Sequence, residues 1–165
     1  MLIISQRQIQ YQVSRIAKKA ARLKPEVLVM IMTAAFPFAS DLLKVLAKKH
    51  NIDCQVGYME CHRVGGGFAK VTKSSLPDVS GKNVLLVDCI FDAGATMREC
   101  TRTLYEVHSA RIVDTACLLW RNDPKTFEYP SFWGFDLKGQ DGFWVGYGLD
   151  DVDGLGRGLP WLESR

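Results

Sequence analysis

The residues best suited to chemistry lie in the stretch VLLVDCIFDAGATM, residues 84–97. An apolar run ends at Asp88, and a second acid follows at Asp92. Carboxylates accept hydrogen bonds from sugar hydroxyls, and they can remove a proton during a reaction. We therefore expect this pair of acids to bind a sugar, to act as a base, or to do both.

Small residues follow the second acid, in the order Ala93, Gly94, Ala95 and Thr96. Gly94 permits a tight turn, and the backbone amides at the start of a following helix form an anion site. A phosphate in this turn and hydroxyls on the two acids would together describe a phosphorylated ribose. The alternative is an ordinary strand–turn–helix in which Asp92 caps the helix.

Apolar periodicity indicates the elements that position these residues. Ser5 and Gln8 resemble a capping box for a first helix, which Pro25 closes. The predicted elements that follow are a strand at 27–32, a helix at 38–50, a strand at 52–60, a strand at 84–88, a helix at 94–107 and a strand at 111–120. This alternation predicts one α/β domain, residues 1–165, with a mainly parallel sheet and helices on both faces.

Two segments have weaker patterns. Residues 61–83 are rich in glycine, lysine and serine and predict a long irregular loop. Residues 143–150, FWVGYGLD, resemble a strand, whereas 151–162 are irregular and glycine-rich. The C-terminal part is therefore expected to form a small appendage over one end of the sheet.

Composition excludes several classes of protein. A net charge of +3 on 165 residues, with basic residues scattered, does not indicate nucleic-acid binding. No segment has the length of a signal peptide or of a membrane span, so we expect a cytoplasmic protein without membrane contact. Five cysteines without a CxxC pair predict reduced thiols, which suits that compartment.

The stretch 84–97 resembles the phosphoribosyl pyrophosphate motif of type I phosphoribosyltransferases. The similarity to the hypoxanthine-guanine phosphoribosyltransferase branch extends over nearly the whole chain: FPFASDLL (36–43) looks like its first helix, and FWVGYGLD like its purine-site strand. The resemblance implies the type I phosphoribosyltransferase fold, with 61–83 as a flexible lid and 136–165 as a purine-side hood. It also implies transfer of ribose 5-phosphate from phosphoribosyl pyrophosphate to hypoxanthine, guanine or xanthine, with Mg²⁺ as cofactor.

The resemblance assigns roles to individual positions. It makes Asp92 the general base near purine N7, and it implies that Asp88 binds the ribose hydroxyls. Asp88 and Asp150 are the magnesium ligands that it implies. The remaining residues that it implies are the phosphate cradle Ala93, Gly94, Ala95 and Thr96, the pyrophosphate ligands Thr33, Ala34, Arg63 and Arg157, and the purine contacts Arg121, Phe143 and Trp144. Core packing is the alternative for Phe143 and Trp144, and a solvated loop charge is the alternative for Arg63.

This sequence departs from the family pattern at several of these positions. Cys89 replaces a second ribose acid, and the loop 32–35 reads Met-Thr-Ala-Ala where Leu-Lys-Gly-Gly is typical. Arg63 and Val64 replace a Ser-Tyr pair, and Arg121 replaces a lysine that contacts the 6-oxo group. Two other functions therefore stay open: a non-catalytic nucleotide-binding relative used for regulation, and a phosphoribosyltransferase for another base. A homodimer or homotetramer is implied by the resemblance.

Overall fold

The computed structural model describes residues 2–123, 125–126, 128–140 and 142–165. Its helices are α1 (Gln6–Ala20), the 3-10 helix η1 (Ala21–Leu23), α2 (Phe36–His50) and α3 (Ala95–Glu106). Its strands are β1 (Ile3–Ile4), β2 (Val27–Met32), β3 (Gln55–Gly65), β4 (Phe68–Ser75), β5 (Asn83–Phe91), β6 (Ile112–Trp120), β7 (Phe132–Asp136), β8 (Trp144–Val145) and β9 (Leu162–Ser164).

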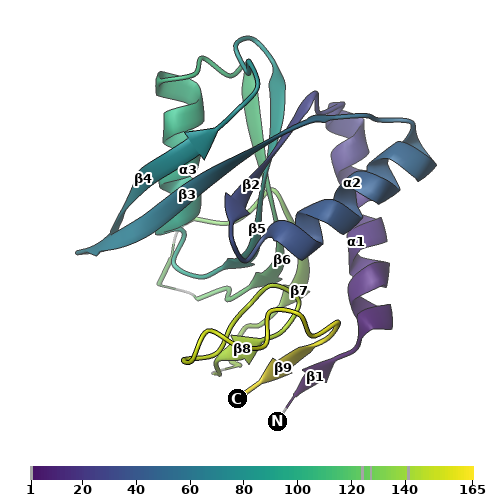
Figure 1. The fold of residues 1–165 in the computed structure, drawn as a ribbon, viewed down its shortest axis with the longest axis vertical. Coiled ribbons are helices and arrows are strands. Elements are labelled where there is room, and N and C mark those ends of the chain that lie inside the picture. Colours follow the sequence, from purple (N-terminus) through teal and green to yellow (C-terminus); the bar gives the residue numbers. More distant parts are fainter. Residues whose placement is uncertain (1, 124, 127, 141) are drawn as a thin grey trace.

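A six-stranded sheet with the order β4-β3-β2-β5-β6-β7 forms the centre of the molecule (Figure 1). Its strands β3, β2, β5, β6 and β7 run parallel, and only the edge strand β4 is antiparallel to its neighbour. Helices α1 and α2 lie on one face and α3 on the other (Figure 1). The predicted α/β fold with a mainly parallel sheet is confirmed.

Alternate residues of β2 show why this strand is apolar throughout. Leu28 and Met30 pack into the cluster formed with α1 and α2, whereas Val29 and Ile31 pack into the cluster formed with α3. A strand that is buried on both faces has no polar face, so its sequence reads as a continuous apolar run. The predicted capping box also forms, because the amide of Ser5 donates to Gln8 Oε1 at 2.8 Å.

The prediction of an irregular loop over 61–83 is wrong. Strand β3 continues to Gly65, and β4 returns antiparallel to it over 68–75, so the segment is largely a β-hairpin. The outer part of this hairpin is exposed, and without a buried face its strands leave no regular apolar alternation in the sequence. The strand expected over 143–150 is likewise limited to Trp144–Val145, after which Gly146 adopts a positive φ of 108°.

A second, three-stranded sheet lies at one end of the main sheet (Figure 1). Its order is β1-β9-β8, so the N-terminal strand, which the sequence pattern did not predict, joins the C-terminal segment. The hydroxyl of Tyr147 donates to Asp41 on α2 at 2.7 Å and ties this appendage to the main domain. Among the described residues, no helix is long and apolar enough to cross a membrane.

Candidate active site

The turn between β5 and α3 is built by Gly94. This residue is the N-cap of α3 with φ +83°, and a Cβ added to it would lie 2.6 Å from Glu128 Oε2 and 3.0 Å from Phe91 Cζ. In the described part of the chain no side chain caps the helix, whose N-cap is Gly94, so the interpretation of Asp92 as an N-cap is wrong. The first amides of α3 therefore have no capping side chain among the described residues, and the anion site predicted for them stays a prediction.

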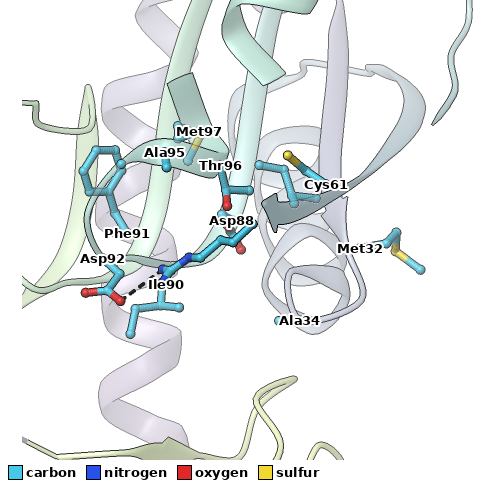
Figure 2. A pocket seen from close by; sticks show the side chains of 13 residues that line it. Met32, Ala34, Cys61, Asp88, Ile90, Phe91, Asp92, Ala95, Thr96 and Met97 are labelled. Carbon is cyan, nitrogen blue, oxygen red and sulfur yellow. Dashed lines mark hydrogen bonds and ion pairs between the residues drawn. The ribbon is translucent and has the colours of Figure 1, made fainter. Parts of the chain in front are cut away.

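A cavity of about 230 Å³ lies beside this turn. Side chains from β2, β3, β5 and the start of α3 surround it, and Figure 2 shows Ala34 and Asp92 on opposite sides of it. The lining residues are Ile31, Met32, Ala34, Cys61, Arg63, Asp88, Ile90, Phe91, Asp92, Gly94, Ala95, Thr96 and Met97. The carboxyl ends of three adjacent parallel strands thus bring both acids, the small-residue turn and Arg63 together.

Asp88 lies in the inner part of this cavity. Its carboxylate accepts a hydrogen bond from the Cys89 amide at 2.7 Å. Burial raises the pKa of Asp88 to about 7, although the amides of Cys89 and Ile90 and the charge of Arg63 oppose the shift. A ligand hydroxyl or a cation at Asp88 would therefore stabilise a carboxylate that the protein alone stabilises poorly.

Asp92 lies between two arginines. Arg63 Nη2 is 3.1 Å from Asp92 Oδ2, the ion pair drawn as a dashed line in Figure 2, and Arg121 Nε is 3.7 Å from Oδ1. Arg121 also donates to the Gly142 carbonyl at 2.7 Å, which fixes its guanidinium. The two pairs hold the Asp92 carboxylate at the edge of the cavity.

A second cavity, of about 380 Å³, adjoins the first through Asp92. Besides Asp92 and Arg121 it is lined by Asn122, Asp123, Leu137, Gly139 and Gln140. The site therefore has two compartments with one carboxylate between them. The first contains the Gly94 turn at the start of α3, and the second is lined mostly by polar and charged side chains.

The structure does not bring the other predicted residues into these two cavities. Within the described part of the chain, neither lining includes Thr33, Ala93, Phe143, Trp144, Asp150 or Arg157. Phe143 is half exposed, whereas the Trp144 side chain is buried in the core, as its packing alternative predicted. Asp150 forms an ion pair with Arg157 at 2.6 Å, and Arg157 also donates to the Gly148 carbonyl.

Comparisons with known proteins agree with this geometry. The family model for the phosphoribosyl transferase domain matches residues 4–151. The chain belongs to the phosphoribosyltransferase family. The hypoxanthine-guanine phosphoribosyltransferase of Aquifex aeolicus is 30% identical over 96% of this chain and 90% of that protein, and the hypoxanthine phosphoribosyltransferase of Escherichia coli is 29% identical over 82% of this chain and 75% of that protein.

Solved structures show the same relationship. A hypoxanthine-guanine phosphoribosyltransferase from Bacillus anthracis, with HEPES in its active site, superimposes with a TM-score of 0.85 at 26% identity. The alignment covers 98% of this phosphoribosyltransferase and 96% of that chain. The resemblance inferred from the motif at 84–97 is thus confirmed over nearly the whole length of the chain.

Two departures of this phosphoribosyltransferase from its family pattern can now be described structurally. In the loop after β2 the Met32–Thr33 peptide is cis, and neither Ala34 nor Ala35 has a positive φ, so alanine fits both positions. Cys89 is buried, and its thiol contacts the Tyr147 carbonyl at 3.7 Å instead of lining the cavity. The side chain of Cys89 therefore faces the C-terminal appendage.

Sequence reasoning missed several lining residues of this phosphoribosyltransferase. Ile90, Phe91 and Met97 lie within or beside the motif itself, and their proximity to Asp92 was the available signal. Cys61 and the β2 residues Ile31 and Met32 reach the cavity only because β2 pairs with both β3 and β5. No local pattern indicates this pairing.

Proposed function

We propose that this protein transfers ribose 5-phosphate from phosphoribosyl pyrophosphate to hypoxanthine or guanine in purine salvage. The products are the nucleoside 5′-monophosphate and pyrophosphate. The observation that carries the proposal is the meeting of the Gly94 turn, the partly buried Asp88 and the ion-paired Asp92 around two adjoining cavities. The family membership and the names of the relatives support the same reaction.

The first cavity suits the sugar and its phosphate. The amides of Ala95 and Thr96 and the Thr96 hydroxyl would bind the 5′-phosphate, since a helix N-terminus attracts an anion. Asp88 would accept hydrogen bonds from the ribose hydroxyls. Together these contacts would fix C1 of the ribose between pyrophosphate and base, which favours reaction through position and charge.

The second cavity suits the base. Arg121 would donate to the 6-oxo group, which favours 6-oxopurines over adenine. Asp92, at the boundary between the two cavities, would accept the proton that the purine loses as its nitrogen bonds to C1. The half-exposed ring of Phe143 would cover the base, and the backbone of Trp144 would contact its edge.

Pyrophosphate would leave on the side of Arg63. The ion pair of Arg63 with Asp92 is exposed, so its guanidinium can exchange a carboxylate for phosphate oxygens at small cost. Thr33 and Ala34 would present backbone groups to the same anion. Arg157 would join it from the C-terminal segment, releasing Asp150.

A magnesium ion fits this site only with help from the substrate. Within the described residues, no three His, Cys, Asp or Glu side chains gather into a metal site. Mg²⁺ prefers oxygen ligands and often takes one or two carboxylates together with substrate phosphates. Asp88, whose partly buried carboxylate lacks a strong counter-charge, would be one ligand, and Asp150 the other. When bound, the ion would neutralise charge on the departing pyrophosphate.

The hairpin of β3 and β4 would act as the lid of the site, within a single domain of residues 1–165. Cys61 and Arg63 on this hairpin already line the cavity, so closing it would exclude water from the reacting sugar. Residues 136–165 would form the purine-side hood. We further propose that the protein forms a homodimer or a homotetramer, and analytical sedimentation would measure which of the two is present.

The decisive experiment supplies phosphoribosyl pyrophosphate and Mg²⁺ with hypoxanthine, guanine, xanthine or adenine and measures the nucleotide formed. We expect inosine or guanosine monophosphate with hypoxanthine or guanine and no product with adenine. Tight nucleotide binding without turnover would instead favour a regulatory relative. Turnover with another base alone would require a different assignment of the second cavity.

A further inference from the structure

Arg98, in the first turn of α3, joins three segments that are distant in sequence. Its Nη1 donates to Glu128 Oε1 at 2.6 Å, and its Nη2 donates to the Gly67 carbonyl at 3.0 Å. Gly67 lies at the tip of the β3–β4 hairpin, and Glu128 lies in the segment between β6 and β7. Arg98 therefore links α3, on which it lies, to the tip of the hairpin and to the segment before β7.

Glu128 lies directly behind the anion-binding turn. A Cβ on Gly94 would be 2.6 Å from Glu128 Oε2, so this carboxylate packs against the residue that forms the turn. Gly94 itself lines the cavity proposed for the phosphate. An uncompensated carboxylate at this position would repel a phosphate dianion, because the Debye length at physiological salt, about 8 Å, does not screen charges this close.

We propose that Arg98 is a positioning residue for phosphate binding, which acts by neutralising Glu128 beside the turn 93–96. The bond to the Gly67 carbonyl holds the guanidinium in the direction of Glu128. Arg98 does not line the cavity among the described residues, so it influences the ligand through Glu128 and not by contact. The proposal rests on the proposed function for its ligand, the 5′-phosphate of phosphoribosyl pyrophosphate.

The test is a double-mutant cycle on Arg98 and Glu128, measured with ribose 5-phosphate in a calorimeter. We expect Arg98→Gln to raise the Kd about 10-fold, and to raise the KM for phosphoribosyl pyrophosphate similarly with kcat changed less than about 3-fold. Glu128→Gln should bind at least as tightly as the unmodified protein. The double variant should return to within about 3-fold of the unmodified protein, because the charge that Arg98 compensates is gone.

Two results would overturn the proposal. One is an unchanged Kd in Arg98→Gln, and the other is a double variant that binds as weakly as Arg98→Gln, which would mean that the hairpin contact matters and the charge does not. If Arg98→Gln fails to fold, Arg98→Lys takes its place, and a Kd more than about 10-fold above that of the unmodified protein would contradict a role of charge.

The same measurements distinguish failure of the proposed transferase function from failure of the role proposed for Arg98. An unmodified protein that binds ribose 5-phosphate but forms no nucleotide would disprove the transferase and leave the Arg98 comparison intact. An unmodified protein that does not bind ribose 5-phosphate would disprove both. Thermal unfolding of each variant shows whether it is folded.

Discussion

Replacing Gly148 with alanine should separate the C-terminal segment from the loop after β2. Gly148 has φ +101°, and a Cβ on it would be 2.0 Å from the Ala34 carbonyl oxygen and 3.0 Å from Pro37 Cδ. The first neighbour is backbone and cannot move aside as a flexible side chain does. Ala34 lines the cavity, so the displacement would reach the site itself.

The size of the effect follows from two costs. A left-handed conformation costs an L-residue about 1–2 kcal/mol, and overpacking costs about 1–3 kcal/mol more. The free energy of unfolding should therefore fall by about 2–5 kcal/mol. A carbon–oxygen contact needs about 3.3 Å, so the two segments must separate by more than about 1 Å, and a misplacement of that size can lower the rate about 10²-fold.

Gly154→Ala is the matched control. Gly154 also has a positive φ, +78°, but a Cβ on it meets no atom within 4 Å. Chemical denaturation should show a loss of only about 1–2 kcal/mol for this variant, and nucleotide formation should continue at nearly the unmodified rate. Equal losses of stability and equal rates for the two alanine variants would refute the argument from the Ala34 contact.

Three further predictions concern the site, the metal and the partly buried thiol of Cys54. Asp92→Asn should lower kcat about 10²-fold or more in a steady-state assay, because a general base is lost, and an unchanged kcat would exclude that role. EDTA should abolish nucleotide formation and excess Mg²⁺ should restore it, whereas undiminished activity in EDTA would contradict a magnesium requirement. Burial, with a smaller contribution from Asp53, raises the pKa of Cys54 from 9.0 to about 11 in the folded state. As the pH rises above 9, the thiol therefore loses its proton in the unfolded state before it does so in the folded state, which lowers the free energy of unfolding. Between about pH 9 and 11 the free energy of unfolding should thus fall more in the unmodified protein than in Cys54→Ser. Chemical denaturation that shows the same fall in both proteins would contradict this.

The sequence by itself determined the central strands of the main sheet and the centre of the site. Strands β2 and β5 are buried on both faces, and burial of that kind requires the continuous apolar runs at 27–32 and 84–87. Asp88, Asp92 and Gly94 lie within seven consecutive residues, so their proximity is a property of the chain. A strand end, an acid and a glycine turn therefore predicted an anion site without knowledge of the rest of the fold.

Only the tertiary structure decided what surrounds that centre. The hairpin of β3 and β4 gains its hydrogen bonds from strand pairing and buries little of its outer half, so composition alone suggested an irregular loop. Arg63 reaches Asp92 across 29 positions, and Arg98 reaches Gly67 across 31. Contacts of this kind depend on which strands become neighbours, and that choice is made by packing of the whole core and not by any local pattern of residues.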